Sequence, residues 1–146
     1  MDARERAVEA LLALVTAAYP WASSPSRRLR LWSDVAPVDR PACFLFEGGF
    51  ETYAAGAGPD PKRSLELKLF VYVDAHDPDL VGAARLNAIM DALDAAFAPT
   101  GPDIALGRVT LGGAAYRCAI DGKPLKDPGD LDGDGLLVVP ITIILP

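Results

Sequence analysis

The sequence predicts an α+β fold, in which a largely antiparallel sheet of five to six strands packs against two helices. Two stretches carry apolar residues at helical spacing, several others alternate or are short and apolar, and the last third is all strand and turn. The strands are therefore grouped apart from the helices. A chain of 146 residues that is 51% hydrophobic and 23% charged is expected to form one domain over 1–146, without disulfides or metal.

The first helix is expected to end before Pro20, because apolar side chains recur at helical spacing between residues 8 and 19. Asp2, with Glu5 three residues later, resembles a capping box at its start. A loop over 21–26 follows. Residues 29–32 are then predicted to form a short strand, which leads into a connection over 33–41.

Two strands with a long insertion between them are expected next. Residues 42–47 are apolar, and residues 64–74 place leucine and valine on alternate positions of one face. The other face begins polar and ends with Phe70 and Tyr72, so either a helix or another subunit should cover that end. Residues 48–63 are rich in glycine and proline and too long for a tight turn, which predicts an extended arm or hairpin loop.

A second helix is predicted to begin with Asp77 as its cap and Pro78 as its first residue. Residues 104–111 and 115–121 flank Gly112-Gly113, which is typical of a hairpin. Residues 122–135 are predicted to be a loop and 136–145 a final strand. Pro140 lies within that strand and has no N–H, so it should sit at an edge or a bulge.

The candidates for chemistry are few. Asp130, Asp132 and Asp134 match the first half of a calcium loop, but Ile141 stands where the closing glutamate belongs, which favours an acidic turn. His76, the single histidine, follows a strand and is interpreted as a loop residue. Cys43 and Cys118 have apolar neighbours and are interpreted as buried, reduced thiols. We therefore expect no enzymatic activity and no cofactor.

Charge also restricts the possible partners. The net charge of −6 argues against a protein that grips nucleic acid, because that affinity comes from cations that meet phosphates. Residues 1–40 carry +1 and the rest −7, and Arg27, Arg28 and Arg30 form the one basic cluster. Such a patch can pair with an acidic patch on a neighbouring subunit, or it can be a solvated strand edge. Neither a signal peptide nor a transmembrane span is expected.

Four stretches together resemble the tail terminator proteins of long-tailed bacteriophages, of the lambda-type minor tail terminator family. They include "VAP" followed by "PACFL", "GPDPK" directly before the long strand, "TLGG" followed by "YRCAIDG", and the ending "VVPI" through "ILP". Their order and spacing, together with the two helices, extend over nearly the whole chain. The sequence differs from the family in having Arg63-Ser64 after Lys62, where a bulky residue is usual, and in its aspartate-rich turn at 130–135.

The resemblance implies a non-enzymatic virion protein that forms a hexameric ring at the head-proximal end of the tail tube. Its partners would be itself, the tail tube protein and the head–tail connector protein, and genome DNA would pass through the lumen without specific binding. It would assemble in the host cytoplasm. The candidate subunit-interface residues are Arg27, Arg28, Arg30, Phe50, Tyr53, Phe70 and Tyr72. The alternatives are another neck component, such as a head–tail connector, or a metal-binding module or hydrolase that uses Asp130, Asp132 and Asp134.

Overall fold

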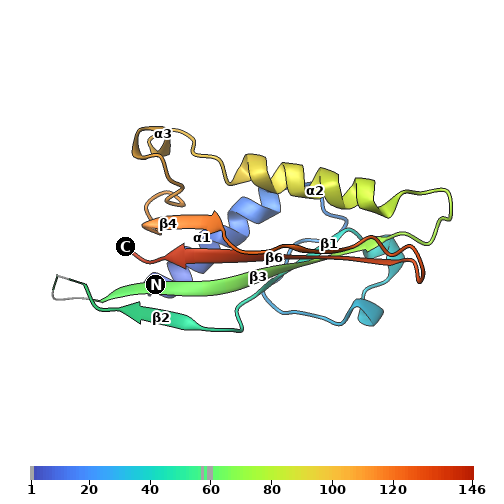
Figure 1. The fold of residues 1–146 in the computed structure, drawn as a ribbon, viewed down its shortest axis with the longest axis horizontal. Helices are drawn as coiled ribbons and strands as arrows, with labels where there is room; N and C mark the ends of the chain where they lie inside the picture. The colour runs from blue at the N-terminus through green and yellow to red at the C-terminus, as the bar shows by residue number, and fades with distance from the viewer. Residues whose placement is uncertain (1, 57, 59–60) are drawn as a thin grey trace.

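The computed structural model describes residues 2–56, 58 and 61–146, and in this part of the chain the predicted α+β fold is confirmed. The sheet has six strands: β1 (Ala42–Phe46), β2 (Glu51–Ala54), β3 (Lys62–Asp74), β4 (Arg117–Ile120), β5 (Leu125–Asp127) and β6 (Asp134–Ile144). The two long strands, β3 and β6, lie side by side in its centre, and every strand pair is antiparallel. Strands β1 and β2 share one edge, whereas β4 and β5 share the other (Figure 1).

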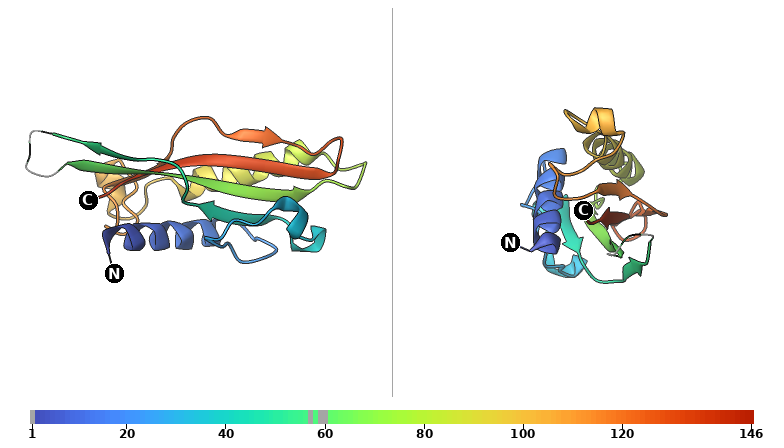
Figure 2. Two further views of the ribbon diagram at one scale, coloured as in Figure 1. Left: turned by 90° about the horizontal axis from the view of Figure 1, so that it is seen from below. Right: turned by 90° about the vertical axis from the view of Figure 1, so that its left-hand side faces the viewer.

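One face of the sheet, here called the inner face, is covered by helices α1 (Ala3–Ala18) and α2 (Gly82–Ala96) (Figure 2). Alternate residues of β3 and β6 point into this layer, and they are buried because each meets an apolar helix stripe. The strands and the helices contribute the following core residues: Leu65, Leu67, Leu69, Val71, Val73, Leu137, Val139, Ile141, Ile143, Val8, Leu11, Val15, Leu86, Ile89 and Leu93.

The opposite, outer face is covered only at one end. There Val35, Ala42, Phe44 and Tyr72 form a separate small core, with Leu29 packed against it. The covering segment, residues 29–40, contains two short 3₁₀ turns, η1 (Trp32–Asp34) and η2 (Pro37–Asp39). The strand predicted over 29–32 is therefore wrong. Only Ser26 bridges to Phe44 of β1, and the chain then leaves the sheet edge to cross its face.

Both helix starts differ in detail from the prediction. Asp2 is the N-cap of α1, but its side chain makes no capping bond, and Glu5 is bonded to Arg27 instead. Helix α2 begins at Gly82, not at Pro78. The Asp77 carboxylate accepts a hydrogen bond from the backbone N–H of Asp79 at 2.9 Å, so it stabilises a separate turn that precedes the helix.

The hairpin predicted around Gly112-Gly113 is also wrong. Residues Asp103–Leu106 form a short helix, α3, and only the second half of the predicted hairpin becomes a strand, β4. The cause is Asp103, whose carboxylate accepts hydrogen bonds from the backbone N–H and the hydroxyl of Thr110, at 2.9 and 2.6 Å. These bonds fold the chain back on itself where the first strand of the hairpin was predicted.

Two segments predicted as loops contain strands. Residues 125–127 form β5 within the expected 122–135 loop, and residues 51–54 form β2 within the expected arm over 48–63. All four residues of β2 are exposed. Positions 57, 59 and 60 of the expected arm lie outside the described residues, and an extended arm remains a prediction.

Candidate interaction surface

A groove crosses the open half of the outer face, because the two sheet edges are interrupted at neighbouring levels. Strand β1 ends at Phe46, opposite Lys68, and β2 begins at Glu51, opposite Leu65. On the other edge β4 ends opposite Ile141 and β5 begins opposite Val138. The first gap spans Glu66 and Leu67 of β3, and the second spans Val139 and Pro140 of β6, which pair with Leu69 and Lys68. The gaps are therefore adjacent along the sheet, and a groove of about 400 Å³ lies between them.

Two glycines with positive φ and one proline accompany these interruptions. Gly49 and Gly122 each have φ of +123°, a conformation that side-chain-bearing residues rarely adopt. Pro140 pairs with Lys68 in the centre of the sheet. Its carbonyl accepts a hydrogen bond from the Asp121 N–H at 3.1 Å, on the side of β4 and β5. Since the nitrogen and the carbonyl of one strand residue point to the same side, the Pro140 nitrogen faces the gap between these two strands. Pro140 is thus tolerated inside a central strand because the neighbouring edge strand is broken there.

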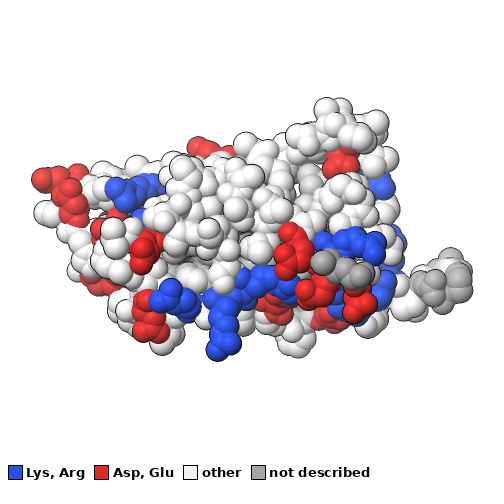
Figure 3. All heavy atoms as spheres, turned by 180° about the vertical axis from the view of Figure 1, so that it is seen from behind, with Lys and Arg blue, Asp and Glu red and all other residues white. Residues whose placement is uncertain are grey.

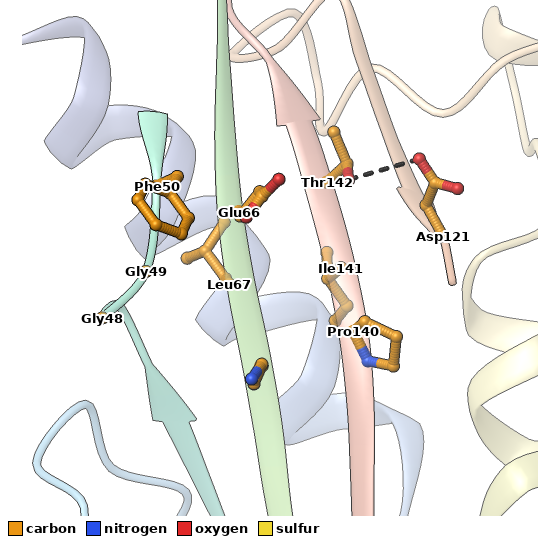
Figure 4. A pocket seen from close by; sticks show the side chains of 10 residues that line it. Gly48, Gly49, Phe50, Glu66, Leu67, Asp121, Pro140, Ile141 and Thr142 are labelled. Carbon is orange, nitrogen blue, oxygen red and sulfur yellow. Dashed lines mark hydrogen bonds between the residues drawn. The ribbon is translucent and has the colours of Figure 1, made fainter. Parts of the chain in front are cut away.

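The groove combines apolar walls with two carboxylates (Figure 4). Phe50 stands at one rim with 77% of its surface exposed, and Pro140 lies on the floor. Glu66 and Lys68 are exposed on β3, and Asp121 stands at the other rim, where Thr142 donates to it at 3.4 Å. Among the described residues, neither the Glu66 nor the Asp121 carboxylate forms an ion pair.

The other end of the outer face is closed by the chain itself. Tyr72 is 5% exposed, and its hydroxyl donates to the carbonyl of Arg30 at 2.6 Å. The aromatic end of β3 is therefore covered neither by a helix nor by another subunit, the two expected alternatives, but by the segment 29–40. Tyr72 consequently cannot serve as an open subunit contact, whereas Phe70 is half-buried and meets the Phe46 ring edge-on at 5.7 Å.

Arg40 fastens this cover to the sheet. Its guanidinium donates to the carbonyl oxygens of Trp32 and Val35 and to the Asp134 carboxylate at 2.7 Å, and its side chain is 3% exposed. His76 also lies near Asp134, with 3.9 Å between its Nε2 and the same Asp134 oxygen, and it is hydrogen-bonded to Asp74. That bond lowers the pKa of Asp74. The single histidine is thus part of a structural polar cluster.

The basic cluster divides into residues with different partners. Arg27 bonds to the carboxylates of Glu5, Glu9 and Glu47, all at 2.7 Å, and these bonds raise its pKa. Arg30 is exposed, with its guanidinium on the carbonyl of Asp34. Arg28 is exposed, and among the described residues its side chain forms no ion pair. Figure 3 shows charges of both signs mixed along the lower half of the molecule seen from behind, under an upper half with little charge.

Two further interface candidates lie on or next to β2. Phe50 is the most exposed aromatic residue of the described chain, and Tyr53 is 55% exposed. Tyr53 accepts a hydrogen bond from Arg4 at 2.7 Å, and Arg4 also pairs with Glu51 at 2.8 Å, so helix α1 holds this strand from the inner side. Phe50 points to the outer face and has no such contact, which leaves it available at the groove.

The three aspartates of the calcium-like turn do not converge. Asp134 is bonded to Arg40, and the Asp132 carboxylate accepts from the backbone N–H of Asp134 at 2.9 Å. Within the described part of the chain, no group of three or more His, Cys, Asp or Glu side chains could hold a metal ion. Burial raises the pKa of both Cys43 and Cys118 to about 12, so neither thiol is a nucleophile at neutral pH.

Sequence reasoning did not find the groove. Glu66 and Asp121 look like ordinary strand and turn carboxylates, and Arg40 looks like one more exposed base. The usable signal was the proline inside an apolar strand, which predicts a broken neighbour, together with Gly48-Gly49 after the preceding strand. What no local pattern indicates is that the two breaks, on opposite edges, fall next to each other along the sheet.

Helices of the described chain include none that is long and apolar enough to cross a membrane. In comparisons with known proteins, no family model and no curated protein matches this sequence.

Proposed function

We propose that this chain is a structural protein of the virion of long-tailed bacteriophages. It forms a hexameric ring on the head-proximal end of the tail tube, ends tube polymerisation and provides the surface to which the head–tail connector binds. The chief support is the order and spacing of the four sequence stretches that resemble the tail terminator family.

The fold supports this proposal through the kind of surfaces that it leaves open. A closed ring needs two different surfaces on each subunit, which meet when successive subunits are related by a rotation. The groove with Phe50, Glu66 and Asp121 is one such surface, and the basic segment with Arg28 is another. Neither is used to complete the core, so both are available to partners.

The charge of the chain fits a position beside DNA. A net charge of −6 gives a surface that repels phosphate on average, so a genome that passes through the ring would slide without being held. We expect no retardation of duplex DNA in a gel-shift assay at low or at moderate salt. A slope of affinity against salt typical of several phosphate contacts would contradict this part of the proposal.

Electron microscopy of tail tubes tests the main proposal. Purified tube protein is polymerised with and without this chain, and tube lengths and end views are compared. We expect added protein to shorten the tubes and to place a sixfold ring on one end only. Uncapped tubes of unchanged length at high protein concentration would contradict the proposal, and heat-unfolded protein is the control for non-specific effects.

A further inference from the structure

The groove on the outer face holds more negative than positive charge. Two carboxylates, Glu66 and Asp121, line it, against one cation, Lys68. The carboxylates form no ion pair within the described chain, although they stand beside the apolar surfaces of Phe50 and Pro140. A carboxylate next to an exposed aromatic ring is a favourable place for a guanidinium, which stacks on the ring and bonds the carboxylate in two places.

Within the basic cluster, Arg28 is the arginine whose side chain forms no hydrogen bond or ion pair among the described residues. Arg27 is committed to three glutamates and Arg30 to a backbone carbonyl, whereas Arg28, between them, is exposed and without an ion pair among the described residues. The backbone around it is fixed, because Tyr72 bonds the carbonyl of Arg30 and Ser26 bridges to β1. Little backbone conformational entropy is therefore lost when Arg28 is used in a contact.

Within one copy the two surfaces are not paired, because neither Arg28 nor the groove carboxylates form an ion pair among the described residues. Arg28 follows Ser26, which lies along the outer edge of β1, whereas the groove crosses β3 and β6 on the sheet face. We propose that Arg28 of one copy of this chain binds in the outer-face groove of a second copy, between Phe50 and the carboxylates of Glu66 and Asp121. Leu31, which is 67% exposed three residues later, lies against the apolar rim in the same contact.

This contact joins two different patches, so it repeats head to tail. The copies form a closed ring only if the rotation between successive copies adds up to a full turn. The inference rests on the proposed ring, since it names the surfaces through which ring subunits meet. It commits to a second copy because the charges of the two patches are complementary in this one chain.

Charge reversal tests the contact. Sedimentation velocity is measured, from dilute solution to the solubility limit, for the natural chain and for three variants: Glu66→Lys with Asp121→Lys, Arg28→Glu, and the triple variant. We expect the first two to weaken self-association at least about tenfold and the triple variant to recover most of it. Asp91→Lys with Asp94→Lys, on the exposed side of α2, makes the same change in net charge as the groove double variant and should leave association unchanged.

Every other outcome overturns the contact. The contact is wrong if the natural chain stays monomeric at all concentrations. It is also wrong if either reversed variant associates as strongly as the natural chain, or if the triple variant stays dissociated. Thermal unfolding of each variant shows whether its fold is intact. Tube capping is scored separately. If the natural chain caps tubes while the reversed variants associate normally, the contact is wrong and the ring proposal stands. If the charge swap works but no tube is capped, the proposed function fails and the contact stands.

Discussion

The two ends of the outer sheet face are built from the same two strands, but the chain closes one end and leaves the other open. At the closed end, Tyr72 and Phe44 are 5% exposed beneath the segment 29–40, which Arg40 fastens to β6. At the open end, Phe50 is 77% exposed and two carboxylates have no ion pair in the described chain. The strands alone do not decide which end becomes core. A distant segment of irregular structure decides it.

The largest effect is expected at Arg40. Replacing it in Arg40→Leu leaves the Asp134 carboxylate without its ion pair and two backbone carbonyls without donors, which should lower the free energy of unfolding by about 3 kcal/mol. Urea unfolding measures the change. The matched variant at the open end, Lys68→Leu, should change it by less than about 0.5 kcal/mol. Equal losses at the two positions would show that the closed end is not specially fastened.

A smaller effect is expected from Tyr72→Phe. This variant removes the hydroxyl that donates to the Arg30 carbonyl at 2.6 Å and should cost about 1 kcal/mol in urea unfolding. Tyr53→Phe is the control, because its hydroxyl accepts from Arg4 on an exposed strand and should contribute less than about 0.5 kcal/mol. If both variants are neutral, the cover over the outer face does not depend on this bond.

Acid should loosen the closed end. The hydrogen bond with His76 lowers the pKa of Asp74 in the folded chain, so its contribution to stability is present above the unfolded pKa and is lost as pH falls through the folded one. The free energy of unfolding should therefore decrease below about pH 4. Asp74→Asn should make this decrease shallower, and Asp94→Asn, on an exposed helix face, should not. The prediction is wrong if both variants follow the natural chain.

At the open end, Phe50→Ser should change the free energy of unfolding by less than about 0.5 kcal/mol, because little of the side chain is buried. The same variant should weaken self-association in sedimentation experiments, since it removes the aromatic rim of the groove. In contrast, Phe44→Ala at the closed end should cost about 3 kcal/mol. A large stability loss in Phe50→Ser would mean that the open end is part of the core after all.

The smallest effect concerns cations. Adding Ca²⁺, Mg²⁺ or a chelator should leave the melting temperature unchanged, because Asp134 is held by Arg40 and Asp132 by a backbone N–H. Differential scanning calorimetry measures this directly. A rise in melting temperature with Ca²⁺ that the chelator reverses would restore the metal-binding alternative.

The parts of the fold that the sequence predicts are those whose side chains alternate or recur with a clear period. Strand β3 and both long helices are of this kind, because one side of each faces the core, whereas β6 is predicted from its nearly continuous apolar run. Strand β2 could not be found in this way, since all four of its residues are exposed and no alternation marks it. Asp103 and Asp77 misled the prediction because the hydrogen bonds of their side chains, two at Asp103 and one at Asp77, outweigh the local pattern.

The candidate site depends on the register of distant segments, which no short window of sequence contains. Arg40 and Asp134 are 94 residues apart, and the groove forms where the breaks on opposite edges fall next to each other along the sheet. Of the residues proposed from sequence as subunit contacts, Arg28 and Phe50 remain open, whereas Arg27 and Tyr72 are used within the chain. The sequence identifies the basic cluster, but only the structure shows that Arg28 is its one arginine without a side-chain partner among the described residues.

The two buried thiols can report how often each edge of the sheet opens. Cys43 lies in β1 and Cys118 in β4, on opposite edges, and both are sealed from solvent on the inner face. A thiol reagent can modify either one only while its own edge strand is detached, so the labelling rate reports that opening event. With Cys43→Ser and Cys118→Ser variants, each edge can be timed separately in the native protein. Assembly that protects one edge and not the other would then be visible as a slower rate at a single thiol.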